Sequence, residues 1–566
     1  MGKAKIYIIK SLTRKAMLCV FCIYSIFRIN LSFGQNLNSK EVTAKKVFNS
    51  ISYAYGSVMH APNFELVPKG MGKRQLLMYY PGDRPVVRMD EEVYDQCISF
   101  GKDSLNALAA LLGHELAHHY EKHDWCSSFS FLLGADNSLI KSITNQDKNS
   151  KQRLESEADY YGCFYGYVAG FDTYALLPRL LDKLYSAYKI PDNIPGYPTK
   201  AERIEIAQKR MDEIKKWTGV FDAGEFLFAL KQFNLAGSCF IHLSKKFPSR
   251  EIYNNAGVCF LYYATSFIKA DELPFVLPIE FDPTTHLKSS VRSANISASQ
   301  KKDSIFHYTD LAVNYFEKAK RVSQEYFTVE LNIGISHLLK QNSSYALGIA
   351  KQLIQWPDIK SNKVNHSNAY TLKAIAEWQG KNNEAGNSFA EAAKLNHNLL
   401  TIYNEKTYNE LNKSTWQSFI NSLYLFLNSE EENQDKQEKS INPLLEKISD
   451  KNPKTYVPNI SSTIKNTVTQ DEVIINQYED VNYISIIVNN KINQYNFICT
   501  KSNYDGKSSQ GVKIGSKEEQ LKDRYGSPSE ILNVPNGYYY IFKKAKVVFH
   551  VNLEGKVTKW FLYNSL

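Results

Sequence analysis

Two histidines and a glutamate between positions 114 and 118 form the pattern in this sequence that most directly suggests chemistry. His114 and His118 are four residues apart, so on an α-helix both imidazoles lie on one face, about one turn apart, and can bind one metal ion. Glu115 follows the first histidine and would lie near the open position of such a site, where a carboxylate can accept a proton from water. The alternative is a helix with two surface histidines.

A second, acidic segment offers the third ligand that a catalytic zinc site with two histidines requires. Glu155 and Asp159 are four residues apart in the predicted helix at 153–163, so they share one face. Glu155 fits the third ligand position, and Asp159 fits a carboxylate that orients a ligating histidine through its other ring nitrogen. Two alternatives stay open: a solvated acidic face, and Glu157, about 200° away around the helix, as the ligand.

For His114 and His118 to share one face, a helix must lead directly into the histidine motif. Residues 104–112 are rich in leucine and alanine, which favours a helix, and Asp103 or Ser104 is a plausible N-cap. Gly113 is the residue that weakens this helix, and its small size would let another element approach closely. Strands are expected before the helix, at 64–68 and 85–90.

The two motifs together, Gly113–His119 and Glu155–Gly162, resemble metallopeptidase family 48. That family includes the CAAX prenyl protease, the HtpX membrane proteases and the BepA-like periplasmic proteases with tetratricopeptide repeats. The resemblance covers roughly residues 40–215 and implies a mainly α-helical domain of the zincin type with one zinc ion per chain. It implies that the metal is held by His114, His118 and Glu155, with Asp159 as companion and Glu115 as general base.

Two features differ from the family pattern. Only 36 residues separate His118 from Glu155, fewer than the family commonly has. Where family members often carry His-Pro before a helix with an arginine, this chain has Tyr197-Pro198 and then Arg203. Because a phenol with a pKa of about 10 is a poor zinc ligand at neutral pH, we expect Tyr197 near the metal as a catalytic hydrogen-bond donor to a developing oxyanion. The alternative is an aromatic side chain that packs on the domain.

The N-terminal residues 1–34 have the composition of a signal peptide. They carry six of the ten net positive charges and no acid, and their apolar run at 16–27 is twelve residues long, too short to span a bilayer comfortably. Small residues before Gln35 provide a cleavage site. We therefore expect an exported bacterial protein, periplasmic or secreted, with an uncleaved N-terminal membrane anchor as the alternative.

Length and composition indicate several globular domains. The 566 residues exceed one ordinary domain, and 43% hydrophobic and 22% charged residues are typical of globular proteins. Beyond residue 34 no basic cluster stands out, which argues against a nucleic-acid partner. Six scattered cysteines lie beyond that point and do not indicate a disulfide scaffold. A single bridge between Cys239 and Cys259 stays open as an alternative. The peptidase domain is expected at 35–216.

A repeated pattern of small residues follows in residues 217–428. Gly224 and Gly334 are each followed after twelve residues by an alanine, and Gly257 lies 33 residues after Gly224. This period predicts tetratricopeptide-like helical repeats, interrupted by an insertion near 270–304. Such arrays bind protein segments; the alternative is a bundle without repeats.

The last part of the chain changes from helices to strands. Residues 429–455 are charged and are expected to be a linker, and 456–566 a small α+β interaction domain. A capping box at Ser516–Glu519 opens its expected helix. This segment resembles the SmpA/OmlA outer-membrane assembly lipoproteins.

Taken together, these features predict an exported zinc endopeptidase that acts on protein substrates in envelope protein quality control. The repeats and the C-terminal domain would recruit substrates or envelope assembly proteins, and the loop at 126–150 could touch a membrane surface. The alternative is a noncatalytic or latent scaffold or chaperone that binds assembly partners.

Overall fold

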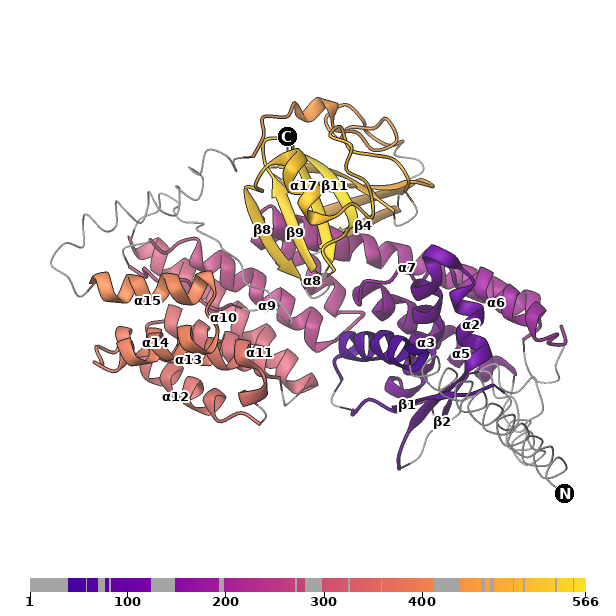
Figure 1. Cartoon of the computed structure of the whole chain (residues 1–566), viewed down its shortest axis with the longest axis horizontal. Helices are drawn as coiled ribbons and strands as arrows, with labels where there is room; N and C mark the ends of the chain where they lie inside the picture. The colour runs from indigo at the N-terminus through magenta and orange to yellow at the C-terminus, as the bar shows by residue number, and fades with distance from the viewer. Residues whose placement is uncertain are drawn as a thin grey trace, which may run out of the picture. The chain divides into compact units, whose positions relative to one another are not determined.

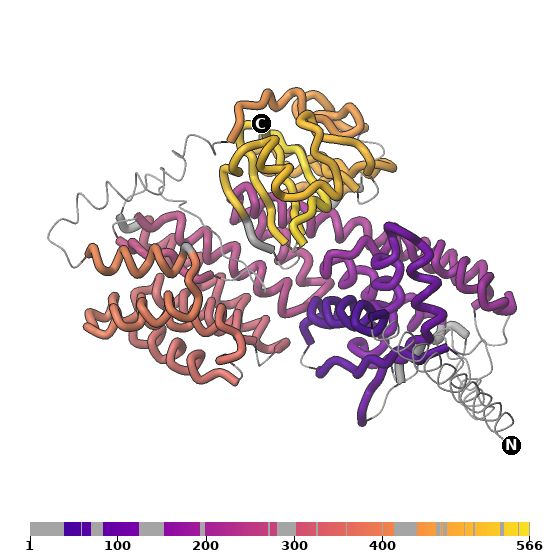
Figure 2. Tube along the Cα trace, viewed as in Figure 1, coloured from indigo at the N-terminus to yellow at the C-terminus, as the bar shows by residue number. Residues whose placement is uncertain are grey.

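A computed structural model of the chain (Figures 1 and 2) has the mainly helical, multidomain architecture that the sequence predicts, with an antiparallel sheet at the C-terminal end. The structure describes residues 39–123, 148–192, 198–279, 298–411 and 438–565, except for gaps at 58, 70–76, 81–82, 270–271, 324–325, 358, 460–463, 469–472, 492, 502–503, 535–536 and 553. The expected signal peptide lies outside these residues.

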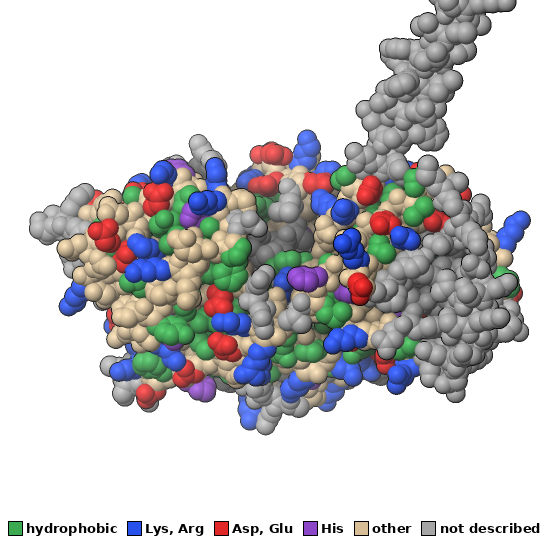
Figure 3. Space-filling model, turned by 90° about the horizontal axis from the view of Figure 1, so that it is seen from below, with side chains coloured by type: hydrophobic (Ala, Val, Ile, Leu, Met, Phe, Trp, Pro, Cys, Tyr) green, Lys and Arg blue, Asp and Glu red, His purple; other side chains and the backbone are tan. Residues whose placement is uncertain are grey.

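The chain divides into two compact units. One contains residues 60–212 together with 1–54, and the other contains 213–566 together with 55–59. Among the described residues, no helix is long and apolar enough to cross a membrane. Basic and acidic side chains are interspersed on the face drawn in Figure 3.

The first unit combines a small sheet with helices. A helix over residues 39–55 precedes three strands, in which the central β3 pairs in parallel with β1 and antiparallel with β2. The strands are β1 (Asn63–Val67), β2 (Leu77–Tyr80) and β3 (Val86–Asp90). The helices are α2 (Glu91–Ile98), α3 (Ser104–Tyr120), α5 (Lys148–Val168), α6 (Leu177–Ala187) and the start of α7 (Lys200–Ala229).

Helix α3 is the core element of this unit. Thirteen consecutive residues from Ala107 to His119 are buried, because α2, α5, α6 and β2 all contact this helix. The leucines and alanines at 107–112 suit such an enclosed position, whereas the buried His114, Glu115, His118 and His119 are polar and call for a functional or structural reason. Asp103 occupies the N-cap position as expected, although its side chain makes no capping hydrogen bond.

The second unit begins with an array of helices in which each packs on the next. Small residues face large ones at the contacts: Gly224 lies against Phe240, and Gly257 lies against Phe316. The expected insertion is shorter than predicted, since α10 begins at Ala298. The helices are α8 (Phe233–Ser244), α9 (Arg250–Thr265), α10 (Ala298–Val322), α11 (Phe327–Leu339), α12 (Ser343–Ile354), α13 (Lys363–Gln379), α14 (Ala385–Leu395) and α15 (Leu399–Leu411).

The C-terminal sheet has the strand order β4-β5-β6-β7-β11-β10-β9-β8, and every neighbouring pair is antiparallel. Helix α17 (Glu518–Tyr525) places Tyr525 against the rings of Phe542 and Phe549. The strands are β4 (Ile464–Val468), β5 (Val473–Glu479), β6 (Tyr483–Asn489), β7 (Gln494–Thr500), β8 (Glu530–Val534), β9 (Gly537–Phe542), β10 (Val547–Asn552) and β11 (Val557–Ser565).

Two expectations about the C-terminal part were wrong. Residues 438–455 are not a linker, because Ile448 is buried in the core of the sheet domain and Glu446 accepts a 2.7 Å hydrogen bond from the Tyr525 hydroxyl. The capping box also begins one residue later than predicted: the backbone N–H of Lys517 donates to the side chain of Gln520.

The cysteines within the described residues are buried and free, so Cys239 and Cys259 form no bridge.

Candidate metal centre

Two glycines bring the helices of the candidate site together. A Cβ atom added at Gly113 of α3 would lie 2.6 Å from the backbone oxygen of Gly162 in α5, and one added at Gly162 would lie 2.5 Å from the Gly113 carbonyl. Real side chains do not approach backbone this closely, so only glycine permits this crossing. The crossing lies beside His114 and within two turns of Glu155, and it therefore sets the distance between the two motifs.

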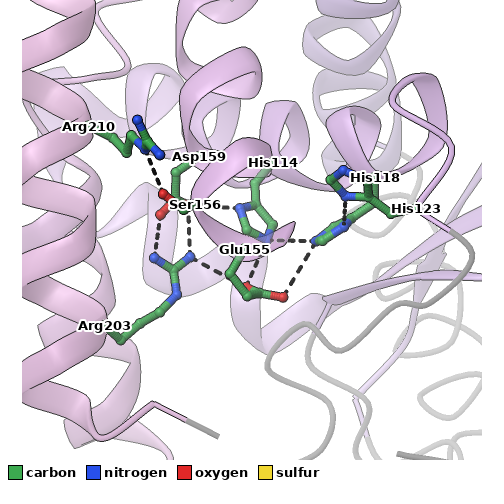
Figure 4. Close-up of polar contacts among 8 residues, drawn as sticks. All are labelled: His114, His118, His123, Glu155, Ser156, Asp159, Arg203 and Arg210. Carbon is green, nitrogen blue, oxygen red and sulfur yellow. Dashed lines mark hydrogen bonds and ion pairs between the residues drawn. The ribbon is translucent and has the colours of Figure 1, made fainter. Parts of the chain in front are cut away.

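Three buried side chains from these helices converge (Figure 4). His114 Nε2 lies 3.1 Å from His118 Nε2 and 3.4 Å from Glu155 Oε2, and His118 Nε2 lies 3.7 Å from Glu155 Oε1. All three side chains are at most 4% exposed. Their ligand atoms lie within 4.8 Å of one another and could hold a metal ion.

The spacing of the three donors fits a small tetrahedral cation. Bonds of 2.0–2.1 Å in tetrahedral geometry place ligand atoms about 3.3 Å apart. The two Nε2 atoms lie 3.1 Å apart, and the nearest Glu155 oxygens lie 3.4 Å from His114 Nε2 (Oε2) and 3.7 Å from His118 Nε2 (Oε1). The Nδ1 atoms of both histidines have other partners. If these Nδ1 atoms carry the protons, two Nε2 lone pairs and a carboxylate face one point, and that arrangement requires a cation between them.

Asp159 holds the first histidine in this orientation. Its Oδ1 accepts a 2.9 Å hydrogen bond from His114 Nδ1, one turn along α5 from Glu155. Arg203 of α7 donates to both oxygens of Asp159, with 2.8 Å from Nη2 to Oδ1, and Nη2 also lies 3.5 Å from Glu155 Oε2. Arg203 is 1% exposed, so a buried guanidinium balances the buried carboxylates and fixes the tautomer of His114.

A second chain of contacts holds the other histidine. His118 Nδ1 lies 2.9 Å from His123 Nδ1, and His123 Nε2 lies 3.4 Å from Glu157 Oε2. The Glu157 side chain is 39% exposed and also pairs with Arg153. Glu157 is therefore outside the converging donors, and of the two glutamates it is Glu155 that lies with the histidines in a group that could hold a metal ion.

The electrostatics favour the ionised carboxylates and the neutral His118 that a metal ion needs, whereas His114 has to give up a proton when a metal ion binds. Burial opposes ionisation of Glu155 and Asp159, but His114 and Arg203 outweigh it and hold both carboxyl pKa values well below their usual range. Burial, followed by the charge of His114, lowers the pKa of His118. Burial also disfavours a charged His114, yet the hydrogen bonds with Asp159 and Glu155 raise its pKa. Ionised carboxylates and a neutral His118 are ready to bind a cation.

The remaining predicted residues take different places. Glu115 is 1% exposed on α3 beside His114. His119 faces elsewhere, since its Nε2 lies 2.8 Å from the backbone oxygen of His60, which supports a structural role. Tyr197 lies outside the described residues, so its expected role as an oxyanion donor stays a prediction.

Sequence reasoning missed two residues of the site. His123 follows His118 by five residues and does not join the donors, but its Nδ1 contacts His118 Nδ1. Arg203 was noted only for its place after Tyr197-Pro198, and its pairing with Asp159, 44 residues earlier, is a tertiary contact. The buried carboxylate pair at 155 and 159 was the available signal, since buried acids require a cationic partner.

Comparisons with known proteins give no family for this chain. No protein-family model matches it, and no curated protein is significantly similar to it. The geometry of the site and the resemblance of its motifs therefore carry the functional argument.

The glycine crossing gives a test of how the site is assembled. We expect Gly162→Ala to destabilise the first unit by about 1–3 kcal/mol, because the added methyl group meets backbone that cannot move aside. The thermal unfolding temperature and the metal affinity should both fall. Gly348→Ala on the exposed side of α12 is the matched control, because its Cβ would meet nothing within 4 Å. Equal behaviour of the two variants would contradict the account.

Proposed function

We propose that the first unit is a zinc-dependent endopeptidase of the zincin type that cleaves protein substrates. The observation that carries this proposal is the buried convergence of His114 Nε2, His118 Nε2 and the Glu155 carboxylate, whose ligand atoms lie within 4.8 Å of one another. Two histidines and one carboxylate are a donor set used by catalytic zinc sites, which keep a fourth position open. Calcium and magnesium prefer all-oxygen sites, so this donor set favours zinc.

The side chains around the donors supply the acid–base chemistry. A zinc ion held by His114, His118 and Glu155 would supply Lewis acidity, which would lower the pKa of water and polarise a carbonyl oxygen. Glu115 then accepts the proton of the attacking water and returns it to the amine that leaves. Its burial supports this role, because a buried carboxylate is costly and metal binding alone does not require one beside His114. Asp159 and Arg203 keep His114 oriented throughout.

The small sheet offers a place for an extended substrate. In the described part of the sheet, β2 is at the edge and pairs with β3 alone, and β2 contacts α3. An extended peptide can add a strand to such an edge. We propose that the scissile chain binds along β2, and that the protein acts after export in envelope protein quality control. The competing function is a latent scaffold or chaperone.

Metal removal and return tests this function. Full-length protein stripped with a zinc chelator should lose cleavage of an unfolded protein such as reduced casein, and one equivalent of Zn²⁺ should restore it. Cleavage that persists without metal would contradict the proposal. Zinc binding with no cleavage of any unfolded substrate would favour the scaffold or chaperone.

A further inference from the structure

A short segment after α9 lies against helices that follow it by about a hundred residues in the sequence. Leu273, Phe275 and Ile279 are buried, and residues 276–279 form no helix, strand or turn. Pro274 and Pro278 fix their own backbone angles and favour an extended conformation for the residues before them. The segment 273–279 (Leu-Pro-Phe-Val-Leu-Pro-Ile) is therefore a short non-helical peptide, bent at residues 273 and 275 and without regular structure over 276–279, and it is seated in the second unit.

Its aromatic residue is held by the rings of α13 and α14. The Phe275 ring stacks on Phe389 at 4.8 Å and meets Trp378 edge-on at 4.9 Å. The ring of Tyr408 in α15 lies 5.5 Å from that of Phe389. Phe275 is 1% exposed, so its side chain is enclosed, with the aromatic rings of α13 and α14 in direct contact with it.

Helix α15 binds the backbone of the same segment. Asn404 Oδ1 accepts a 2.8 Å hydrogen bond from the Val276 N–H, and Asn404 Nδ2 donates a 2.8 Å hydrogen bond to the Val276 carbonyl. The Tyr403 hydroxyl donates to the Pro274 carbonyl at 3.1 Å. These contacts recognise an extended backbone as a neighbouring strand would, whatever the side chain of the bound residue.

The asparagine is the informative part of this arrangement. An amide buried in a helix interior is costly unless both its donor and its acceptor are satisfied, and an apolar residue would pack there more simply. At Asn404, which is fully buried, this satisfaction comes from one residue of a remote segment. The amide therefore needs a bound extended peptide, and it would be as well satisfied by another chain as by this one.

We propose that α13–α15 form a binding site for an extended polypeptide segment that carries an aromatic residue next to proline, and that residues 273–279 are its resident ligand. A partner segment of this chemistry displaces the resident one. The resident segment is tethered to the array, so it acts at a high effective concentration and only a well-matched partner competes. The proposal goes beyond the peptidase and does not depend on the metal centre.

The test weakens the resident segment and leaves the site intact. In the full-length protein, Phe275→Ala should bind a fluorescent peptide of sequence Leu-Pro-Phe-Val-Leu-Pro-Ile at least tenfold more tightly than the wild type does. The peptide with alanine in place of its phenylalanine should bind at least tenfold more weakly. Adding Asn404→Leu, which keeps the branched skeleton of the side chain and removes the amide, should also weaken binding at least tenfold. A folded Phe275→Ala protein that binds no better than wild type would overturn the proposal.

A measurement on the wild-type protein covers the case in which Phe275→Ala does not fold. Millimolar peptide should increase hydrogen exchange at residues 273–279, including the Val276 amide, while α13–α15 stay protected. Unchanged exchange of this segment would show that residues 273–279 are a fixed part of the core.

Discussion

Replacing Glu115 by glutamine is expected to leave the metal content and the fold unchanged and to reduce peptide hydrolysis by about 10²–10⁴-fold. The amide has nearly the same shape but cannot accept a proton from water. Because Glu115 is 1% exposed on a fully enclosed helix, bulk water or buffer cannot easily replace it. The measurement is kcat on an unfolded protein substrate, with zinc content determined on the same sample.

Glu205→Gln is the matched control for this experiment. The Glu205→Gln substitution makes the same chemical change on the surface of the same unit. The Glu205 side chain is 65% exposed and pairs with Lys209. Its rate should stay at the wild-type value. Equal rates for the Glu115→Gln variant and the wild type would remove Glu115 from the mechanism, whatever the metal content.

The second large effect concerns the third ligand. Glu155→Ala is expected to weaken zinc binding by more than about 100-fold, since even the partners that only orient a ligand typically cost 10–100-fold when removed. Glu157→Ala, two residues away, should retain zinc because its carboxylate contacts His123 and Arg153 and does not face the donors. Competition with a chromogenic chelator gives both dissociation constants.

The comparison of these two variants separates the candidate ligands cleanly. They lie on one helix, remove the same group and differ in which face they alter. Full zinc binding by Glu155→Ala together with loss by Glu157→Ala would show that the assignment is wrong. His114→Ala and His118→Ala should behave like Glu155→Ala, since all three supply one donor to the same point.

The part of the site that the sequence predicted is the part fixed by local geometry. His114 and His118 share a helix face because of the helical period, and the same holds for Glu155 and Asp159. The sequence also favoured Glu155 over Glu157, and in the structure, with α3 and α5 crossing at Gly113 and Gly162, it is the Glu155 carboxylate that lies among the histidine donors. Sequence spacing alone contains no information about that crossing.

What the sequence did not predict depends on contacts between distant segments. Arg203 reaches Asp159 only because α7 begins beside α5, and the seating of Phe275 on Phe389 joins residues 114 positions apart. The polar composition of 429–455 also led to the wrong prediction of a linker there. Glu446 is in fact buried and accepts hydrogen bonds from Tyr525 and Ser509. Secondary-structure propensity reflects only the local sequence around a residue. The positions of these residues are determined by tertiary contacts with distant segments.

The central claim is that one zinc ion binds between the two motif helices. X-ray diffraction from zinc-loaded crystals on both sides of the zinc absorption edge tests it most directly. The account predicts one strong anomalous peak per chain, about 2.0–2.2 Å from His114 Nε2, His118 Nε2 and a Glu155 oxygen. A zinc-loaded protein with no peak at this position, or with its peak on other side chains, would contradict the account.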